Sequence, residues 1–303
     1  MTSSNLLSTL EELLAIPSPC GMCDAIVEHV ALKLSRLGIE SRKTRRGALR
    51  ALIRGESTKP ALAFSAHLDT LGAMVQGIRD NGRPSLTPIG NWSARFAEGA
   101  RVSVHLEQKP AVRGSILPKK ASGHRFNHEV DNQPGTWENL ELRLDADTES
   151  AMQTLDLGIQ VGDMVSIDPQ PEFLDNGFLV SRFLDNKAAV AVLLTALGRM
   201  QTNGAKPERD IHLYFSVSEE IGTGAGHMVA PEVADLVTLD IAVNAQGQNA
   251  HNHGVTIVLK DAAGPYDRSL SRQLLKICRD NDIAHSRDVF RHYFSDTHSA
   301  ALA

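Results

Sequence analysis

The sequence predicts an α/β fold in which a mostly parallel sheet is covered by helices and a β-rich segment is inserted into the chain. Three observations lead to this prediction. Strand-like apolar runs alternate with helical stripes at both ends of the chain, short β-like pieces and turns replace them between about residues 71 and 165, and 303 residues exceed one average domain. We therefore expect residues 1–70 and 166–303 to form one domain, with residues 71–165 inserted as a second.

Two helices and two strands are expected in the first part of the chain. Leucines at helical spacing in residues 5–15 predict a helix that ends before Pro17. A second apolar stripe at residues 26–37 predicts a helix with Gly38 at its C-terminal cap. Strand-like runs follow at residues 48–53 and 61–66.

Alternating strands and helices resume after the β-rich segment. The pieces "DMVSID", "DIHLYFSV" and "LVTLDIAV" are typical of strands, and "NKAAVAVLLTALGRM" predicts a long helix. A Gly-rich turn, "GTGAG", follows the second of these strands. A last helix carries Leu270, Leu274, Ile277 and Cys278. This order is typical of an open, largely parallel sheet with helices on both faces.

Composition excludes several classes of partner. The formal net charge is -5, from 31 Lys+Arg and 36 Asp+Glu, so the chain has no basic field that would bind nucleic acid. No stretch approaches the roughly 18 consecutive apolar residues of a membrane-spanning helix. The first residues lack the features of a signal peptide, and the 3 cysteines fit a reducing compartment. We expect a cytoplasmic protein without nucleic-acid or membrane partners.

Six ionisable side chains lie at predicted strand ends or at the start of a helix. They are His67, Asp69, Asp185, Glu219, Glu220 and Asp240. Each one alone is more often a cap or a hydrogen-bonded polar group than a ligand. Ligands gather at the carboxyl ends of strands in α/β sheets, and several carboxylates brought together there would be costly without a cation. Imidazole and carboxylate ligands suit zinc, cobalt or manganese, and their number makes two ions bridged by a shared Asp plausible.

Pieces of sequence spanning nearly the whole chain resemble the dinuclear metallo-aminopeptidases that include tetrahedral, deblocking and glutamyl aminopeptidases. The matching pieces are "LLAIPSPCG", "SAHLDTLGAM", "VGDMVSIDP", "SRFLDNKAAVAVLL", "SEEIGTGAG", "VTLDIAVNAQGQN" and "RDVFRHYFSDTHSA". Within that family, "NWSARFAEGARV" and "DNQPGTWENLELR" resemble the subgroup associated with N-acetylglutaminylglutamine amide osmoprotectant metabolism. The resemblance implies a zinc-exopeptidase-like catalytic domain. It also implies that residues 71–165 are a dimerisation domain, through which copies of the chain assemble from dimers into a tetrahedral dodecamer.

The resemblance also implies a role for each metal-ligating residue. His67 and Asp240 resemble the terminal ligands of one metal ion, Asp185 resembles the carboxylate that bridges both ions, and Glu220 resembles a terminal ligand of the other ion. The implied cofactor is two divalent metal ions per subunit, of zinc, cobalt or manganese.

Two further carboxylates resemble the catalytic residues of the family. Glu219 resembles the general base, which takes a proton from the attacking water and delivers it to the leaving amine. Asp69 resembles the carboxylate that orients the ring of His67. The implied activity is removal of N-terminal residues from short peptides. A deacylase or amidase acting on an acylated dipeptide is an alternative with the same hydrolytic chemistry.

The sequence departs from the family pattern at one ligand. In the family a last His ligand of the second metal follows the region that matches "SDTHSA", and none of the 303 residues matches it. The second site is therefore expected to be one ligand short. Either the chain is a shortened form, or another group takes the place of this His. The available imidazoles include His251, His253, His292 and His298. A poorly active chain, or an assembly subunit without activity, is the second alternative.

Overall fold

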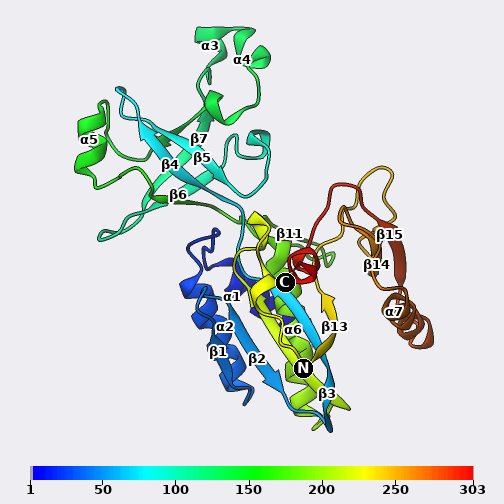
Figure 1. Ribbon diagram of the computed structural model, residues 1–303. Coiled ribbons are helices and arrows are strands. Elements are labelled where there is room, and N and C mark those ends of the chain that lie inside the picture. Colours follow the sequence, from blue (N-terminus) through cyan, green and yellow to red (C-terminus); the bar gives the residue numbers. More distant parts are fainter. Residues whose placement is uncertain (1–2, 303) are drawn as a thin grey trace. The chain divides into compact units, whose positions relative to one another are not determined.

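The computed structural model describes residues 3–302. The chain divides into two compact units (Figure 1). One is formed by Ala31–His67 with Ala188–Ala303, and the other by Thr2–Val30 with Leu68–Lys187.

A five-stranded sheet forms the centre of the first unit. Its strands, in spatial order, are β1 (Ser41–Lys43), β2 (Leu49–Ile53), β12 (Arg209–Ser216), β3 (Ser57–His67) and β13 (Val233–Thr238). β3 runs parallel to β12 and β13, whereas β2 runs antiparallel to both β12 and β1. The predicted α/β class is confirmed, and the sheet is mixed, with its parallel part made by three neighbouring strands.

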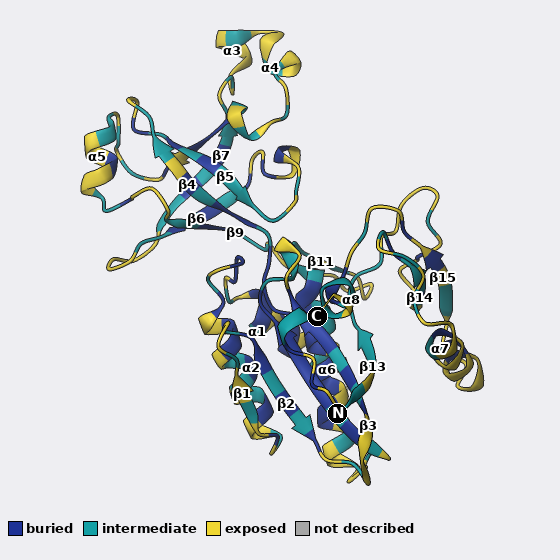
Figure 2. Cartoon of the chain, in the orientation of Figure 1, coloured by how far each residue is buried: buried dark blue, intermediate teal, exposed yellow. Residues whose placement is uncertain are grey.

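Burial along the strands explains the order in which they pair. β12 lies between β2 and β3, and all but two of its residues are buried, which is typical of a central strand covered on both faces. In β2, buried and half-buried residues alternate, as they do in a strand with one face toward the core. Figure 2 shows the buried residues concentrated along these strands.

The predicted helices are present. They are α1 (Ser3–Leu14), α2 (Asp24–Arg36), α6 (Leu184–Thr202) and α7 (Arg268–Asp280). Gly38 follows α2 with a φ of +73°, and the N–H of Ile39 bonds back to the carbonyl of Leu34 at 2.9 Å. This left-handed cap is the one that the glycine predicts.

The last part of the first unit holds a small separate sheet. β14 (Val255–Lys260) and β15 (His285–Val289) pair in parallel, and α7 connects them along the chain. Ile257, Leu275 and Cys278 form a small buried cluster there. The helix α8 (Asp296–Ala301) follows β15.

The second unit contains a six-stranded antiparallel sheet. Its strands, in spatial order, are β5 (Pro84–Ile89), β4 (Gly72–Ile78), β9 (Met164–Ile167), β6 (Arg101–His105), β7 (Val112–Pro118) and β8 (Leu140–Leu144). Short helices α3 (Gly123–Phe126), α4 (Glu129–Asn132) and α5 (Ala151–Asp156) lie between these strands in the sequence, and a two-residue pair, β10 (Glu172–Phe173) with β11 (Leu179–Val180), follows β9. The predicted dimerisation role of residues 71–165, and their exact limits as a domain, stay predictions.

Alternating strand residues make the core of the six-stranded sheet. Val102 and Val104 of β6 are fully buried, as are Ile116 of β7 and Leu142 of β8, and they belong to one apolar cluster. Between residues 3 and 302, no helix combines the length and apolar character needed to cross a bilayer.

Candidate active site

The candidate site begins at the carboxyl ends of three parallel strands. In the sheet register, Ser216 of β12 lies beside His67 of β3, and Thr238 of β13 lies beside Ser65 of β3. Carboxyl ends of parallel neighbours meet at the same sheet edge. Glu219 and Glu220, which follow β12 after two residues, and Asp240, which follows β13 after one, are therefore brought to the edge at which β3 ends in His67.

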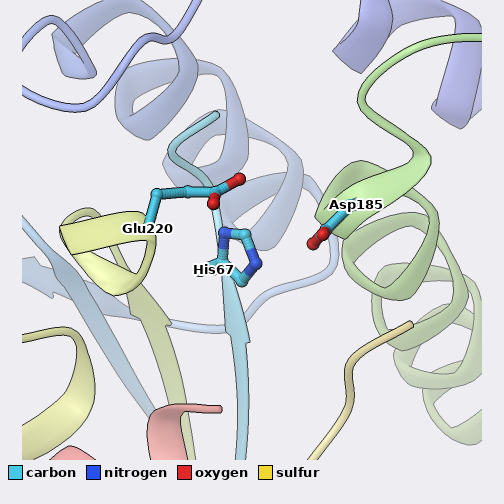
Figure 3. A group of neighbouring side chains, drawn as sticks. All are labelled: His67, Asp185 and Glu220. Carbon is cyan, nitrogen blue, oxygen red and sulfur yellow. The ribbon is translucent and has the colours of Figure 1, made fainter. Parts of the chain in front are cut away.

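His67, Asp185 and Glu220 form a group that could hold a metal ion. One ligand atom from each residue lies within 4.8 Å of the other two, and Figure 3 shows the Asp185 carboxylate and the His67 ring facing each other. His67 is buried, with 1 % of its side chain exposed, and the two carboxylates are half-buried. A buried imidazole with carboxylates is a donor set that zinc, cobalt and manganese accept.

Asp185 enters this group from the first turn of α6. The backbone there is not yet helical: Asp185 has φ -74° and ψ 104°, and the Asp185–Asn186 peptide bond is cis. Regular helix begins after Asn186 and continues to Thr202.

Glu219 and Asp240 add two more carboxylates around His67. The Nε2 atom of His67 lies 3.7 Å from Oε2 of Glu219 and 4.0 Å from Oδ1 of Asp240. Only 14 % of the Glu219 side chain and 9 % of the Asp240 side chain are exposed. Of the six residues selected from the sequence, the structure thus brings five together, four carboxylates around the imidazole of His67.

The burial of Glu219 raises the pKa of its carboxyl group. The pKa of Glu219 is raised to about 9, chiefly because burial penalises its charged form. The carboxylates of Asp240, Asp296 and Glu220 also raise this pKa, whereas His67 lowers it. Such a group is ionised at neutral pH only when a cation nearby compensates its charge.

Asp69, the sixth selected residue, lies two positions after His67 and is completely buried. The pKa of the Cys23 thiol is raised to about 12, first by burial and then by the charges of Asp69 and Cys20. The role of Asp69 in orienting the His67 ring stays a prediction.

Lys187, two residues after Asp185, is the only charged side chain among the largest fully buried ones in the described chain. Its Nζ donates a hydrogen bond of 2.6 Å to the carbonyl of Ile16. Burial lowers the pKa of Lys187 to about 7. The sequence did not single out this lysine, because a lysine near a helix start is ordinarily exposed.

The four imidazoles named as substitutes for the missing ligand lie outside the metal-capable group. His251, His253 and His292 are exposed, and the ring of His298 in α8 lies 4.8 Å from the ring of Phe294, centroid to centroid, in a tilted contact. Within residues 3–302, the metal-capable group contains none of them.

Sequence reasoning missed one buried carboxylate near the site, Asp296 at the start of α8. It is 1 % exposed and accepts hydrogen bonds from the side chain of Ser216 and from the backbone of Ala225. Its only signal in the sequence was the piece "SDTHSA", which carried the family resemblance without indicating what the Asp does.

Comparison with known families decides the identity of the chain. Residues 47–303 match the family model described as M42 glutamyl aminopeptidase. The chain belongs to this family. It is therefore an enzyme, an aminopeptidase of the M42 family, as the sequence motifs predicted. The assignment to the osmoprotectant-associated subgroup stays a prediction.

Individual relatives agree with this assignment. The YhfE protein of Bacillus subtilis (strain 168) is 32 % identical over 294 residues, which cover 97 % of this M42 chain and 85 % of that protein. The glutamyl aminopeptidase of Lactococcus lactis is 24 % identical over 169 residues, which cover 54 % of this chain and 45 % of that enzyme.

Solved structures share the fold of this M42 chain. The TET aminopeptidase from the marine sediment archaeon Thaumarchaeota archaeon SCGC AB-539-E09 superposes with a TM-score of 0.88 at 17 % identity, covering 98 % of this chain and 85 % of that one. The TET1 peptidase of Pyrococcus horikoshii superposes with a TM-score of 0.83 at 22 % identity, covering 97 % and 87 %. The predicted zinc-exopeptidase-like fold is confirmed.

Proposed function

We propose that this M42 enzyme is a metal-dependent aminopeptidase that removes N-terminal residues from short peptides, with Glu219 as the general base. The observation that carries the proposal is the pair Glu219 and Glu220 beside His67. Glu220 supplies a ligand atom to the metal-capable group, and Glu219 has a carboxylate oxygen 3.7 Å from the same imidazole. A base next to a ligand is needed for activating water and is unnecessary for binding alone.

The residues fit two divalent ions. His67 and Asp240 would be terminal ligands of one ion, Glu220 would be a ligand of the other, and Asp185 would bridge them. The fit rests on the donor chemistry, one imidazole with carboxylates, and on the raised pKa of Glu219, which is due first to burial and in smaller part to the neighbouring carboxylates. When bound, the ions would supply Lewis acidity that favours attack of water on the scissile carbonyl.

Glu219 would move the proton in this reaction. Its side chain is mostly buried, so it holds one position and meets little competing water. A cation close to Glu219 would lower its pKa from about 9 toward neutrality, where a carboxylate both accepts a proton from the attacking water and returns it to the leaving amine.

The charge of the site favours a substrate with a free N-terminus. A protonated or metal-bound amine finds partners among the half-buried carboxylates, whereas an acylated nitrogen offers them no charge. A panel of aminoacyl-nitroanilides beside N-acetylated dipeptide amides tests this proposal. We expect turnover of the first set with added zinc, cobalt or manganese. Turnover of only the acetylated set would instead make the enzyme a deacylase.

We also propose that the chain assembles with copies of itself in the cytoplasm. Several apolar side chains of the second unit are well exposed, including Phe96 at 73 %, Met152 at 68 % and Val161 at 68 %. Burial of such side chains against a second copy would remove apolar surface from water. The structurally similar TET1 peptidase of Pyrococcus horikoshii forms a tetrahedron or a large octahedral shell. Light scattering tests the proposal, and a monomer at micromolar concentration would contradict it.

A further inference from the structure

The carboxylate of Asp296 joins two points of the chain that are far from it in sequence. Oδ2 of Asp296 accepts a hydrogen bond of 2.7 Å from Oγ of Ser216, which lies 80 residues earlier. Oδ1 accepts a hydrogen bond of 2.9 Å from the backbone N–H of Ala225, 71 residues earlier. Both bonds are buried.

The two partners of Asp296 lie on either side of the segment that carries the acid pair. Ser216 is the last residue of β12, and Ala225 begins the second of two short 3-10 turns, Glu219–Ile221 and Ala225–His227. Residues 217–224 between them hold Glu219 and Glu220. Within this segment, the N–H of Gly222 bonds to the carbonyl of Glu219 and the N–H of Thr223 to the carbonyl of Ser218, so these bonds shape the turn itself. The carboxylate of Asp296 therefore fixes both ends of this segment at once.

Gly224 shows that the segment is fitted closely to this carboxylate. A Cβ atom on Gly224 would lie 1.7 Å from Oδ1 of Asp296 and 3.2 Å from the Cα atom of Glu219. Any side chain at position 224 would therefore displace either the Asp296 carboxylate or the backbone of Glu219. Glycine is the residue that permits this close approach.

The neighbouring residue extends the connection to the other two strands. Oγ1 of Thr297 donates a hydrogen bond of 2.8 Å to Oγ1 of Thr238, which in turn lies 2.9 Å from Oγ of Ser65. Thr238 precedes Asp240 by two residues, and Ser65 precedes His67 by two. The start of α8 is thus hydrogen-bonded directly to β12 and β13, and through Thr238 to β3.

We propose that Asp296 is a positioning residue of this peptidase, which holds Glu219 and Glu220 in place through Ser216 and Ala225. The inference rests on the proposed function, because it assumes that this pair serves as base and ligand. Asp296 is 1 % exposed and directs its oxygens at Ser216 and Ala225, so it acts through the segment 217–224.

The test compares Asp296→Ala with Asp296→Asn in the full chain. The Asn side chain can keep both connections, since its carbonyl accepts from the Ala225 N–H and its amide donates to the Ser216 hydroxyl. The Ala side chain keeps neither. Ser299→Ala is the matched control, because it removes a different hydrogen bond within α8, from Ser299 Oγ to the carbonyl of Asp296 at 3.0 Å.

Three readouts separate positioning from simple stabilisation of the fold. They are zinc affinity by calorimetry, kcat on an aminoacyl-nitroanilide, and hydrogen exchange of residues 217–225 in the metal-free protein. For Asp296→Ala we expect zinc affinity and kcat to fall about 10- to 100-fold, and exchange at Ala225 to accelerate at least about tenfold. Asp296→Asn should stay within about threefold of the wild type in all three, and Ser299→Ala should match the wild type.

Two results would overturn the proposal. One is wild-type zinc affinity and kcat in Asp296→Ala. The other is an equal loss of zinc affinity and kcat in Asp296→Asn and Asp296→Ala, which would assign the effect to the charge of Asp296. If Asp296→Ala does not fold, Ser216→Ala replaces it, and wild-type values in that variant count against the proposal. Failure of the proposed function is a separate outcome, in which the wild-type protein itself binds no zinc and hydrolyses no peptide substrate.

Discussion

The imidazole of His67 and the carboxylate of Glu219 lie 3.7 Å apart, measured from Nε2 to Oε2, although 152 positions separate them in the chain. β3 and β12 are parallel neighbours, and His67 ends one strand while Glu219 follows the other after two residues. The sheet therefore sets the distance between the two side chains. The proposed hydrolysis depends on a base held this close to a metal ligand.

Glu219→Gln should abolish most of the activity and leave metal binding nearly intact. Gln has the size of Glu and cannot accept the proton of water, so we expect kcat to fall about 10²- to 10⁴-fold. Zinc affinity, measured by calorimetry, should change by less than about tenfold. Glu220→Gln is the matched control one residue away, and it should weaken zinc binding. Equal activity in Glu219→Gln and the wild type would exclude Glu219 as the base.

Two metal ions should bind with unequal affinity. One ion would have His67, Asp240 and Asp185 as ligands, whereas the other would have Glu220 and the shared Asp185 among the described residues. Fewer protein ligands give weaker binding. Calorimetric titration of the metal-free chain with zinc should show one tight and one weaker step, and His67→Ala should remove the tight step. Two equally tight steps would contradict the assignment.

In the metal-free protein, the stability that Glu219 contributes should fall as the pH rises from about 5 to 9. Glu219 has a folded-state pKa of about 9 and an ordinary unfolded value of 4.5, so the folded state binds the extra proton between these limits. Stability from this group is fully present below the unfolded pKa and is lost as the pH rises through the folded pKa. Urea unfolding at pH 5, 7 and 9 should show this decline in the difference between the wild type and Glu219→Gln, because the opposite contribution of Lys187 above pH 7 is common to both proteins.

Added zinc should remove most of that decline, because a cation near Glu219 favours its charged form. If the unfolding free energy changes equally with pH in Glu219→Gln and in the wild type, the decline has another source.

Lys187 should give the opposite pH dependence in a higher range. Its folded-state pKa is about 7 and its ordinary value is 10.5, so between these limits the unfolded state binds the extra proton. The contribution of Lys187 to stability should therefore rise with pH across this range, with a limiting slope of about 1.4 kcal/mol per pH unit. Relative to the wild type, Lys187→Met should be most stable below pH 7. This advantage of the variant should shrink toward pH 10.

The hydrogen bond from Lys187 to the Ile16 carbonyl is lost in this variant at every pH. The test therefore follows how the difference in unfolding free energy between Lys187→Met and the wild type changes with pH. Urea unfolding at pH 6, 8 and 10 measures it. A constant difference over that range would show that Lys187 keeps an ordinary pKa in the folded protein.

The sequence was sufficient to locate the residues at strand ends. His67, Glu219 and Glu220 follow apolar runs whose alternation marks strands, and parallel neighbours must bring such ends to one edge. Strand direction was harder to predict, because alternation does not distinguish β2, which runs antiparallel to β12, from a parallel strand. Asp296 could not be located by pattern, since its partners are a hydroxyl and a backbone N–H at 80 and 71 residues' distance.

The close fit of Gly224 against Asp296 couples the residue types that positions 224 and 296 can hold. Only 1.7 Å separates the Asp296 Oδ1 atom from the place where a Cβ on residue 224 would be. A side chain at position 224 would fit only beside a smaller residue at position 296, and that residue would lack the hydrogen bonds to Ser216 and Ala225. Among distant homologues, the two positions should therefore vary together or remain fixed together.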